Sequence, residues 1–161
     1  MQTFTDNEKR SWTIHVTVDA VKRVRTLLGV NLLEVIEGGL LERFIRDPVL
    51  LCDVIYAVCK PEADSKGITD EQFGRAMAGD AIDGASKALL GGLVDFFPSA
   101  QDRANLRRVL DTTWKVLDRA RQAVSQRLEA GELEKVVESA LPSASAPSGS
   151  APASSASTPD P

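Results

Sequence analysis

The stretch Asp47–Pro61, which has the sequence DPVLLCDVIYAVCKP, is the strongest indicator of the fold class. The aspartate at its start is a good helix N-cap, and Pro48 suits the first helical position, where its missing N–H costs no hydrogen bond. The residues from 49 to 59 are nearly all apolar. A helix that is apolar on all sides usually lies at the centre of a protein. We therefore predict a central helix that ends at Lys60 and Pro61, within a fold that is mainly α.

A short β-hairpin is predicted before the helices, over about residues 2–17. Trp12, Ile14 and Val16 alternate with polar residues, a period of two that is typical of a half-buried strand. The polar residues 6–9, DNEK, favour a turn, and Thr3–Thr5 can form the first arm. Because a lone hairpin is marginally stable, its apolar face is expected to lie on the helices.

Other start and stop signals predict further helices along the chain. The first helix is capped by Thr17, stops at Gly29 and presents the apolar residues Val18, Val21, Val24 and Leu28. Two short helices, 32–36 and 40–45, follow and are separated by Gly38 and Gly39. A further helix follows a capping box of Thr69 and Gln72, and another runs from Asp80 to Pro98.

The last predicted helix is long and starts at Ser99. Its apolar or neutral positions follow a 4-3-4-3-4 spacing, which suits packing of one helix on another. These positions are Leu106, Leu110, Thr113, Leu117, Ala120 and Val124. The predicted helices thus cover about residues 18–130, and residues 1–141 are expected to form a single helical domain.

The C-terminal residues 142–161 are almost wholly Ser, Ala and Pro. Such a composition cannot bury enough apolar area to offset the entropy lost on ordering, so a disordered tail is expected.

Composition and charge exclude several classes of function. The formal net charge of −4 gives no overall field that attracts phosphate backbones, so nucleic acid is not an expected partner. Residues 1–9 are polar and the apolar runs are too short to span a bilayer, which predicts a cytoplasmic protein without membrane contact. Cys52 and Cys59 lie seven positions apart on the predicted helix, too far for a disulfide, and are expected to be buried free thiols.

The sequence offers no recognisable catalytic, metal or cofactor site. His15 is the only histidine and falls on the polar face of the predicted strand, so the common zinc sites are not expected. The acidic residues do not follow the register of a calcium loop. The pairs Gly38-Gly39 and Gly91-Gly92 lack the spacing of phosphate loops and are interpreted as bends or close-packing sites. We expect neither an enzyme nor a cofactor.

The predicted function is to bind another polypeptide through apolar side chains. Large side chains near the start of the last helix and along its stripe are the best anchors. The candidate partner-binding residues are Phe96, Phe97, Leu106, Leu110, Trp114 and Leu117. Each could instead belong to the core, and the sequence leaves open whether the chain also forms homo-oligomers.

Several short runs give the chain a resemblance to a known family. They are Trp12-Thr13-Ile14, Val21 to Arg25, Gly29 to Leu33, Asp47 to Leu51, Ala57 to Pro61 and Asp95 to Pro98. This pattern, which covers roughly Phe4 to Ser99, resembles the small tail assembly chaperones encoded in phage and prophage tail modules.

The resemblance implies a helical cytoplasmic protein that binds the long, helical tape measure protein and delivers it to polymerising tail tube subunits. It also implies absence from the finished virion and no catalytic residues. In some such systems a frameshifted longer product recruits the tube protein, and the Ser/Ala/Pro tail could end the unshifted product. A structural tail or head-tail connector protein, or less favoured a regulatory subunit of an enzyme, would share this composition.

Overall fold

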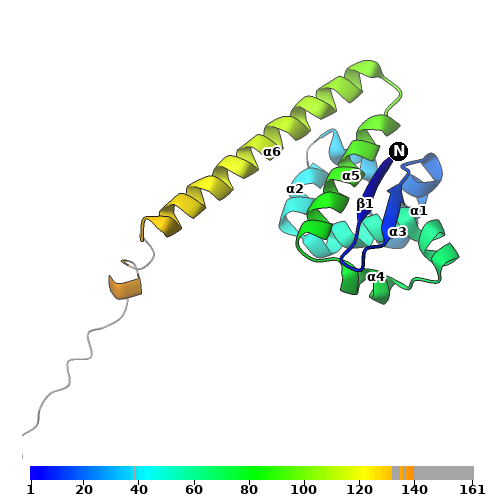
Figure 1. The fold of residues 1–161 in the computed structure, drawn as a ribbon. Coiled ribbons are helices and arrows are strands. Elements are labelled where there is room, and N and C mark those ends of the chain that lie inside the picture. The colour runs from blue at the N-terminus through cyan, green and yellow to red at the C-terminus, as the bar shows by residue number, and fades with distance from the viewer. Residues whose placement is uncertain (38, 132–134, 136, 140–161) are drawn as a thin grey trace, which may run out of the picture. The chain divides into compact units, whose positions relative to one another are not determined.

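The computed structural model describes residues 1–37, 39–131, 135 and 137–139. The chain divides into two compact units, residues 1–115 and 116–161. Among the described residues the fold is mainly α with one antiparallel two-stranded sheet, which confirms the predicted class (Figure 1). The predicted disordered tail, residues 142–161, lies outside the described residues.

The hairpin joins β1 (Gln2–Thr5) to β2 (Ser11–Ile14), with Phe4 opposite Trp12. Its loop is organised by Asp6, which is only 2% exposed. One carboxylate oxygen accepts the backbone N–H groups of Glu8 and Arg10, both at 2.9 Å. The other oxygen accepts hydrogen bonds from Arg10 Nε at 2.7 Å and from Trp12 Nε1 at 2.8 Å. Four donors therefore satisfy one buried carboxylate and tie the loop to the second strand.

The hairpin packs against α5 (Asp80–Phe96) at two glycines, and β1 runs beside this helix (Figure 1). A Cβ atom on Gly92 would lie 3.0 Å from the Cγ2 atoms of both Ile14 and Val16. A Cβ atom on Gly91 would lie 3.2 Å from Cδ of Gln2. The interpretation of this glycine pair as a close-packing site is therefore confirmed.

Helix α1 (Val18–Leu28) packs against α3 (Pro48–Lys66). Its predicted ends are confirmed, because Thr17 accepts the N–H of Ala20 and Gly29 closes the helix at a φ of 66°. The prediction that Val18 faces the core is wrong, since its side chain is 59% exposed. Val18 opens the helix on the solvent side, and the buried position in the first turn is taken by Ala20.

Helix α3 continues to Lys66 with Pro61 in its interior, so the predicted end at Lys60 and Pro61 is wrong. Proline has no N–H, and the carbonyl four residues earlier, that of Ala57, loses its helical donor. Arg23 of α1 replaces it: Nη1 donates to the carbonyl oxygens of Ala57 at 3.0 Å and Val58 at 3.2 Å. A hydrogen bond from α1 thus replaces the one that Pro61 cannot donate within α3.

The free edge of β2 is covered by side chains from the last turns of α3. Glu62 Oε2 accepts the N–H of Thr13 at 2.9 Å, and Lys66 Nζ donates to the carbonyl of Ser11 at 2.6 Å. The thiol of Cys59 lies 3.7 Å from the carbonyl oxygen of Thr13. Because these backbone groups are already hydrogen-bonded, a strand of another protein cannot readily pair with this edge.

The first unit also contains three short helices: η1 (Leu32–Val35, a 3₁₀ turn), α2 (Gly39–Arg46) and α4 (Asp70–Ala76). Of the glycine pair predicted to form a bend, Gly39 begins α2 and Gly38 lies outside the described residues. The capping box of Thr69 and Gln72 at the start of α4 is confirmed.

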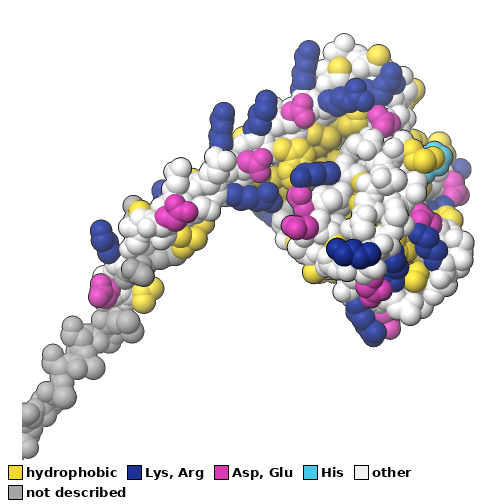
Figure 2. All heavy atoms as spheres, in the orientation of Figure 1, with side chains coloured by type: hydrophobic (Ala, Val, Ile, Leu, Met, Phe, Trp, Pro, Cys, Tyr) yellow, Lys and Arg dark blue, Asp and Glu magenta, His cyan; other side chains and the backbone are white. Residues whose placement is uncertain are grey.

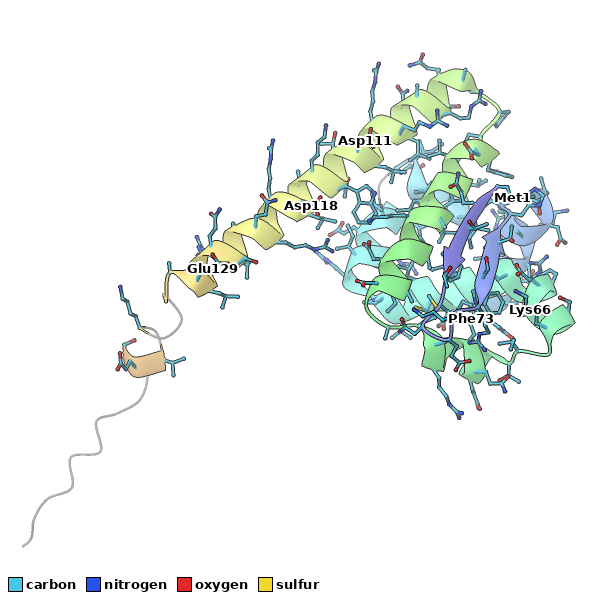
Figure 3. The ribbon with its side chains drawn as sticks, in the orientation of Figure 1. Met1, Lys66, Phe73, Asp111, Asp118 and Glu129 are labelled. Atoms are coloured by element: carbon cyan, nitrogen blue, oxygen red, sulfur yellow. The ribbon has the colours of Figure 1, made fainter. Side chains whose placement is uncertain are left out.

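An aromatic cluster fixes α4 under the hairpin. Phe73, labelled in Figure 3, belongs to α4. Its ring centroid lies 4.9 Å from that of Trp12 and 5.4 Å from that of Tyr56. Its contact with Trp12 is edge to face, an arrangement that aromatic pairs prefer. The three rings therefore join α4, β2 and α3 in one part of the core.

The longest helix, α6 (Ala100–Glu129), begins in the first unit and continues into the second. Ser99 Oγ accepts the N–H of Asp102 at 3.3 Å, which confirms the predicted cap. In the first unit Leu106 and Leu110 belong to the hydrophobic core. The described part of the second unit consists of the C-terminal half of α6, the turn at 130–131, and residues 135 and 137–139.

Candidate functional site

A groove in the first unit lies where β1, α5 and the N-terminal half of α6 meet, and it encloses about 300 Å³. Its floor is apolar and is formed by Leu90, Gly91, Val94 and Leu110. Leu90, Val94 and Leu110 are buried in the core and present only their edges to the groove. Figure 2 shows apolar side chains gathered beside this half of α6, with charged side chains around them.

The rim of the groove is polar. Asp95 is central to it, because it accepts Arg107 Nη2 from α6 at 3.3 Å and Gln2 Nε2 from β1 at 3.4 Å. Arg107 and Asp95 are both largely exposed, so their ion pair contributes at most about 1 kcal/mol to stability. Lys87 and Asp111 add further charges to the rim. An apolar floor inside a charged rim is the layout of many protein-binding surfaces.

Trp114 lines the groove from α6 and is partly exposed, while part of its ring packs against the core. A tryptophan with this placement offers a large apolar surface whose position is already fixed by the protein. Such side chains frequently dominate the energy of protein association.

The other candidate residues occupy different environments. Phe97, Leu106 and Leu110 are buried in the core, and Phe96 is half-buried and meets the ring of Phe97 edge to face at 5.8 Å. Leu117 lies in the second unit and is half-buried. The structure brings Leu110 and Trp114 together in one groove, and it does not place the two phenylalanines there.

The apolar stripe of α6 continues through the second unit. Val124 is 57% exposed and Leu128 is 52% exposed. With Leu117 they extend the line of Leu106 and Leu110, because residues spaced by three or four lie on one face of a helix. Among the described residues of this unit, no second helix or strand buries the stripe.

Two kinds of reactive group, metal sites and activated thiols, can be assessed among the described residues. No group of His, Cys, Asp and Glu side chains among them could hold a metal ion. Burial, and then the neighbouring Asp53, raises the pKa of Cys52 to about 11. Burial, and then Glu62, raises the pKa of Cys59 to about 12. Both thiols are therefore protonated at neutral pH and are poor nucleophiles. Cys59 is buried as predicted, whereas Cys52 is only partly buried.

A second hollow, of about 310 Å³, lies between β2, α1 and α3. Its main polar groups already have structural partners: Arg23 donates to the carbonyls of α3, and Glu62 accepts the N–H of Thr13. His15 stands exposed on its wall, as predicted from the strand pattern. We therefore interpret this hollow as part of the packing between α1 and α3 and not as a binding site.

Of the residues that line the groove, the sequence analysis named only Leu110 and Trp114 as candidates, and it missed the hydrogen-bonded group at the rim. Gln2, Asp95 and Arg107 come from three different elements, and their meeting depends on the packing of the hairpin on α5. The pair Gly91-Gly92 was the one local sign, since it marked the place where another element approaches α5 closely.

No protein-family model matches this chain, and searches of curated proteins and of solved structures give no match either. No helix among the described residues is long and apolar enough to cross a membrane.

Proposed function

We propose that this protein binds a helical polypeptide, and that it acts as a tail assembly chaperone that holds the tape measure protein during phage or prophage tail assembly. One observation carries the proposal. The apolar stripe of α6 starts in the core at Leu106 and Leu110 and then continues over exposed residues of the second unit.

A helix is the partner that this surface suits. The 4-3-4 spacing of the stripe matches the spacing with which two helices interlock their side chains. Strand addition is disfavoured at β2, because Glu62 and Lys66 occupy its free edge. In the first unit, Trp114 of the same helix lines an apolar groove and is a further candidate anchor.

The choice of the tape measure protein rests on the resemblance of residues 4–99 to tail assembly chaperones. In the proteins that this pattern resembles, the tape measure protein is long, helical and prone to aggregate, as expected of a chain with apolar helical faces. Covering these faces requires an apolar helical surface and no catalysis, and the exposed stripe of α6 supplies such a surface. The site of action would be the cytoplasm of the host cell.

Co-expression with a tape measure protein, followed by pull-down, tests the proposal. We expect co-purification, and we expect Val124→Ser with Leu128→Ser to reduce capture at least about ten-fold, because both side chains are exposed on the stripe. The matched control is Leu27→Ser with Val49→Ser, which removes two exposed apolar side chains from the first unit. It should leave capture unchanged.

Two results would count against the proposal. The first is failure of the intact chain to capture the tape measure protein. The second is recovery of this chain from finished virions, which is the behaviour of a structural tail or connector protein and not of a chaperone.

A further inference from the structure

The net charge of −4 hides two regions of opposite sign. Residues 1–99 contain 15 Asp and Glu against 11 Lys and Arg, whereas α6 contains four Asp and Glu against seven Lys and Arg. The helix that carries the apolar stripe is therefore basic, and the hairpin and helices before it are acidic. A charged partner would distinguish strongly between these two regions.

The charges of α6 are also ordered around the helix. With about 100° between successive residues, Arg121 and Arg127 lie about 40° and 80° from the centre of the stripe, on opposite sides of it. The same spacing places Asp111, Asp118 and Glu129 about 100–120° from the stripe. These three acidic residues are labelled along α6 in Figure 3. Two arginines thus border the exposed part of the stripe, and the acidic residues stand further back.

These two arginines are available to a partner. Arg121 makes one long contact, 3.5 Å, with Asp118, and both side chains are well exposed. No carboxylate among the described residues forms a salt bridge with Arg127. Exposed arginines on long side chains can reorient toward a partner at little cost.

We infer that the second-unit half of α6 selects an acidic amphipathic helix, with its apolar face on Leu117, Val124 and Leu128 and its carboxylates beside Arg121 and Arg127. This inference deepens the proposed function and rests on it, because it specifies which segments of a helical partner the chain holds. The acidic region before α6 repels such a segment, so binding is confined to α6.

Two other occupants fit the surface less well. A second copy of α6 would bring two basic helices together, which opposes association through this face. A membrane surface is usually met by a helix with aromatic side chains on its apolar face, but residues 116–129 contain none, and Ala120 lies within the stripe.

Synthetic peptides provide the test. Two labelled peptides of about eight helical turns would share one leucine stripe and differ only in carrying Glu or Lys on both sides of it. Binding of each to the full chain would be measured by fluorescence anisotropy at low and high salt. We expect the Glu peptide to bind about ten-fold more tightly at low salt, and the difference to shrink at about 1 M salt, where screening acts within about 3 Å.

Variants of α6 locate the effect. Arg121→Glu with Arg127→Glu should abolish or reverse the preference for the Glu peptide. The matched control is Lys115→Glu with Arg119→Glu, which makes the same change in net charge on the side of α6 opposite the stripe and should keep the preference. Circular dichroism would confirm that both double variants retain the helix content of the parent chain.

Equal affinity for the two peptides, tighter binding of the Lys peptide, or the same loss in both double variants would overturn the inference. Tighter binding to phosphatidylserine vesicles than to the Glu peptide would overturn it in favour of a membrane. If the intact chain captures the tape measure protein but shows no preference for the Glu peptide, the proposed function stands and this inference fails. If the chain prefers the Glu peptide but does not capture the tape measure protein, the inference stands and the proposed function fails.

Discussion

Arg23 donates a hydrogen bond to the carbonyl group of α3 that Pro61 leaves without its helical donor. Its guanidinium donates to the carbonyl oxygen of Ala57, the one that Pro61 leaves without a donor, and to that of Val58. Asp19, one turn earlier on α1, forms an ion pair with the same guanidinium and holds it in place. A carbonyl group of the central helix is therefore satisfied by a side chain 38 residues earlier in the sequence.

The first prediction tests this relationship. Arg23→Met should lower the free energy of unfolding by about 1–3 kcal/mol, because it leaves the Ala57 carbonyl without a donor. In a Pro61→Ala background the same substitution should cost clearly less, since the alanine introduced there can donate its own N–H. Denaturant unfolding of the four proteins gives the coupling energy. Lys22→Met, an exposed control on the same helix, should change stability by at most about 0.5 kcal/mol. Equal costs of Arg23→Met in the parent and Pro61→Ala backgrounds would refute the link between Arg23 and Pro61.

The buried carboxylate of Asp6 makes stability depend on pH. Burial raises its pKa, but the hydrogen bonds from Trp12 and from the backbone and side chain of Arg10 outweigh burial and lower the pKa below its ordinary value. A carboxyl group with a lowered pKa in the folded state stabilises the protein above its unfolded pKa, about 3.9 for aspartate. That stabilisation is lost as the pH falls through the lower, folded value.

The second prediction follows from this sign. Asp6→Asn should lower the free energy of unfolding by about 1–3 kcal/mol at pH 7, and its difference from the parent chain should shrink below about pH 4. Urea unfolding followed by tryptophan fluorescence measures both. Asp64→Asn is the control, because Asp64 is exposed and its carboxylate pairs with Lys60, so less than about 1 kcal/mol is expected. A gap between Asp6→Asn and the parent chain that stays constant from pH 7 to pH 3 would contradict the assignment.

The third prediction concerns the contact between the hairpin and α5. Gly92→Ala places a Cβ atom 3.0 Å from the Cγ2 atoms of both Ile14 and Val16, which must move by a few tenths of an ångström. We expect a loss of about 1–3 kcal/mol. On the same helix, the nearest atom to a Cβ on Gly84 is 3.9 Å away. Gly84→Ala should therefore be neutral or stabilise by up to about 1 kcal/mol through helix propensity. Thermal melts of the two variants compare them directly, and equal melting temperatures would show that the glycine contact is not tight.

The fold was largely predictable because its signals are local. Thr17, Gly29 and the capping box of Thr69 and Gln72 each act within one helical turn, and their roles were confirmed. The passage of α3 through Pro61 was not predictable, since it depends on Arg23 from another helix. For the same reason the sequence identified Leu110 and Trp114 by their spacing on one helix, but not the rim that Gln2, Asp95 and Arg107 form around them.

The fourth prediction separates the two roles of the groove residues. Leu110 is buried, so Leu110→Ala should mainly lower stability, by about 2–4 kcal/mol. Trp114 is partly exposed in the groove, so Trp114→Ala should mainly weaken capture of the helical partner, by about 2 kcal/mol or more if it is a binding hot spot. Part of the indole packs on the core, and some loss of stability is expected as well.

Thermal stability and partner affinity must be measured on the same preparations, below the melting temperature of each variant. Affinity for the tape measure protein is then compared only among molecules that are folded, which removes the contribution of unfolding from the binding result. We expect Leu110→Ala to be the less stable of the two variants and Trp114→Ala to be the weaker binder. A Trp114→Ala protein that is destabilised but binds normally would assign the tryptophan to the core alone, and the anchor would have to be sought among the exposed residues of the second-unit stripe.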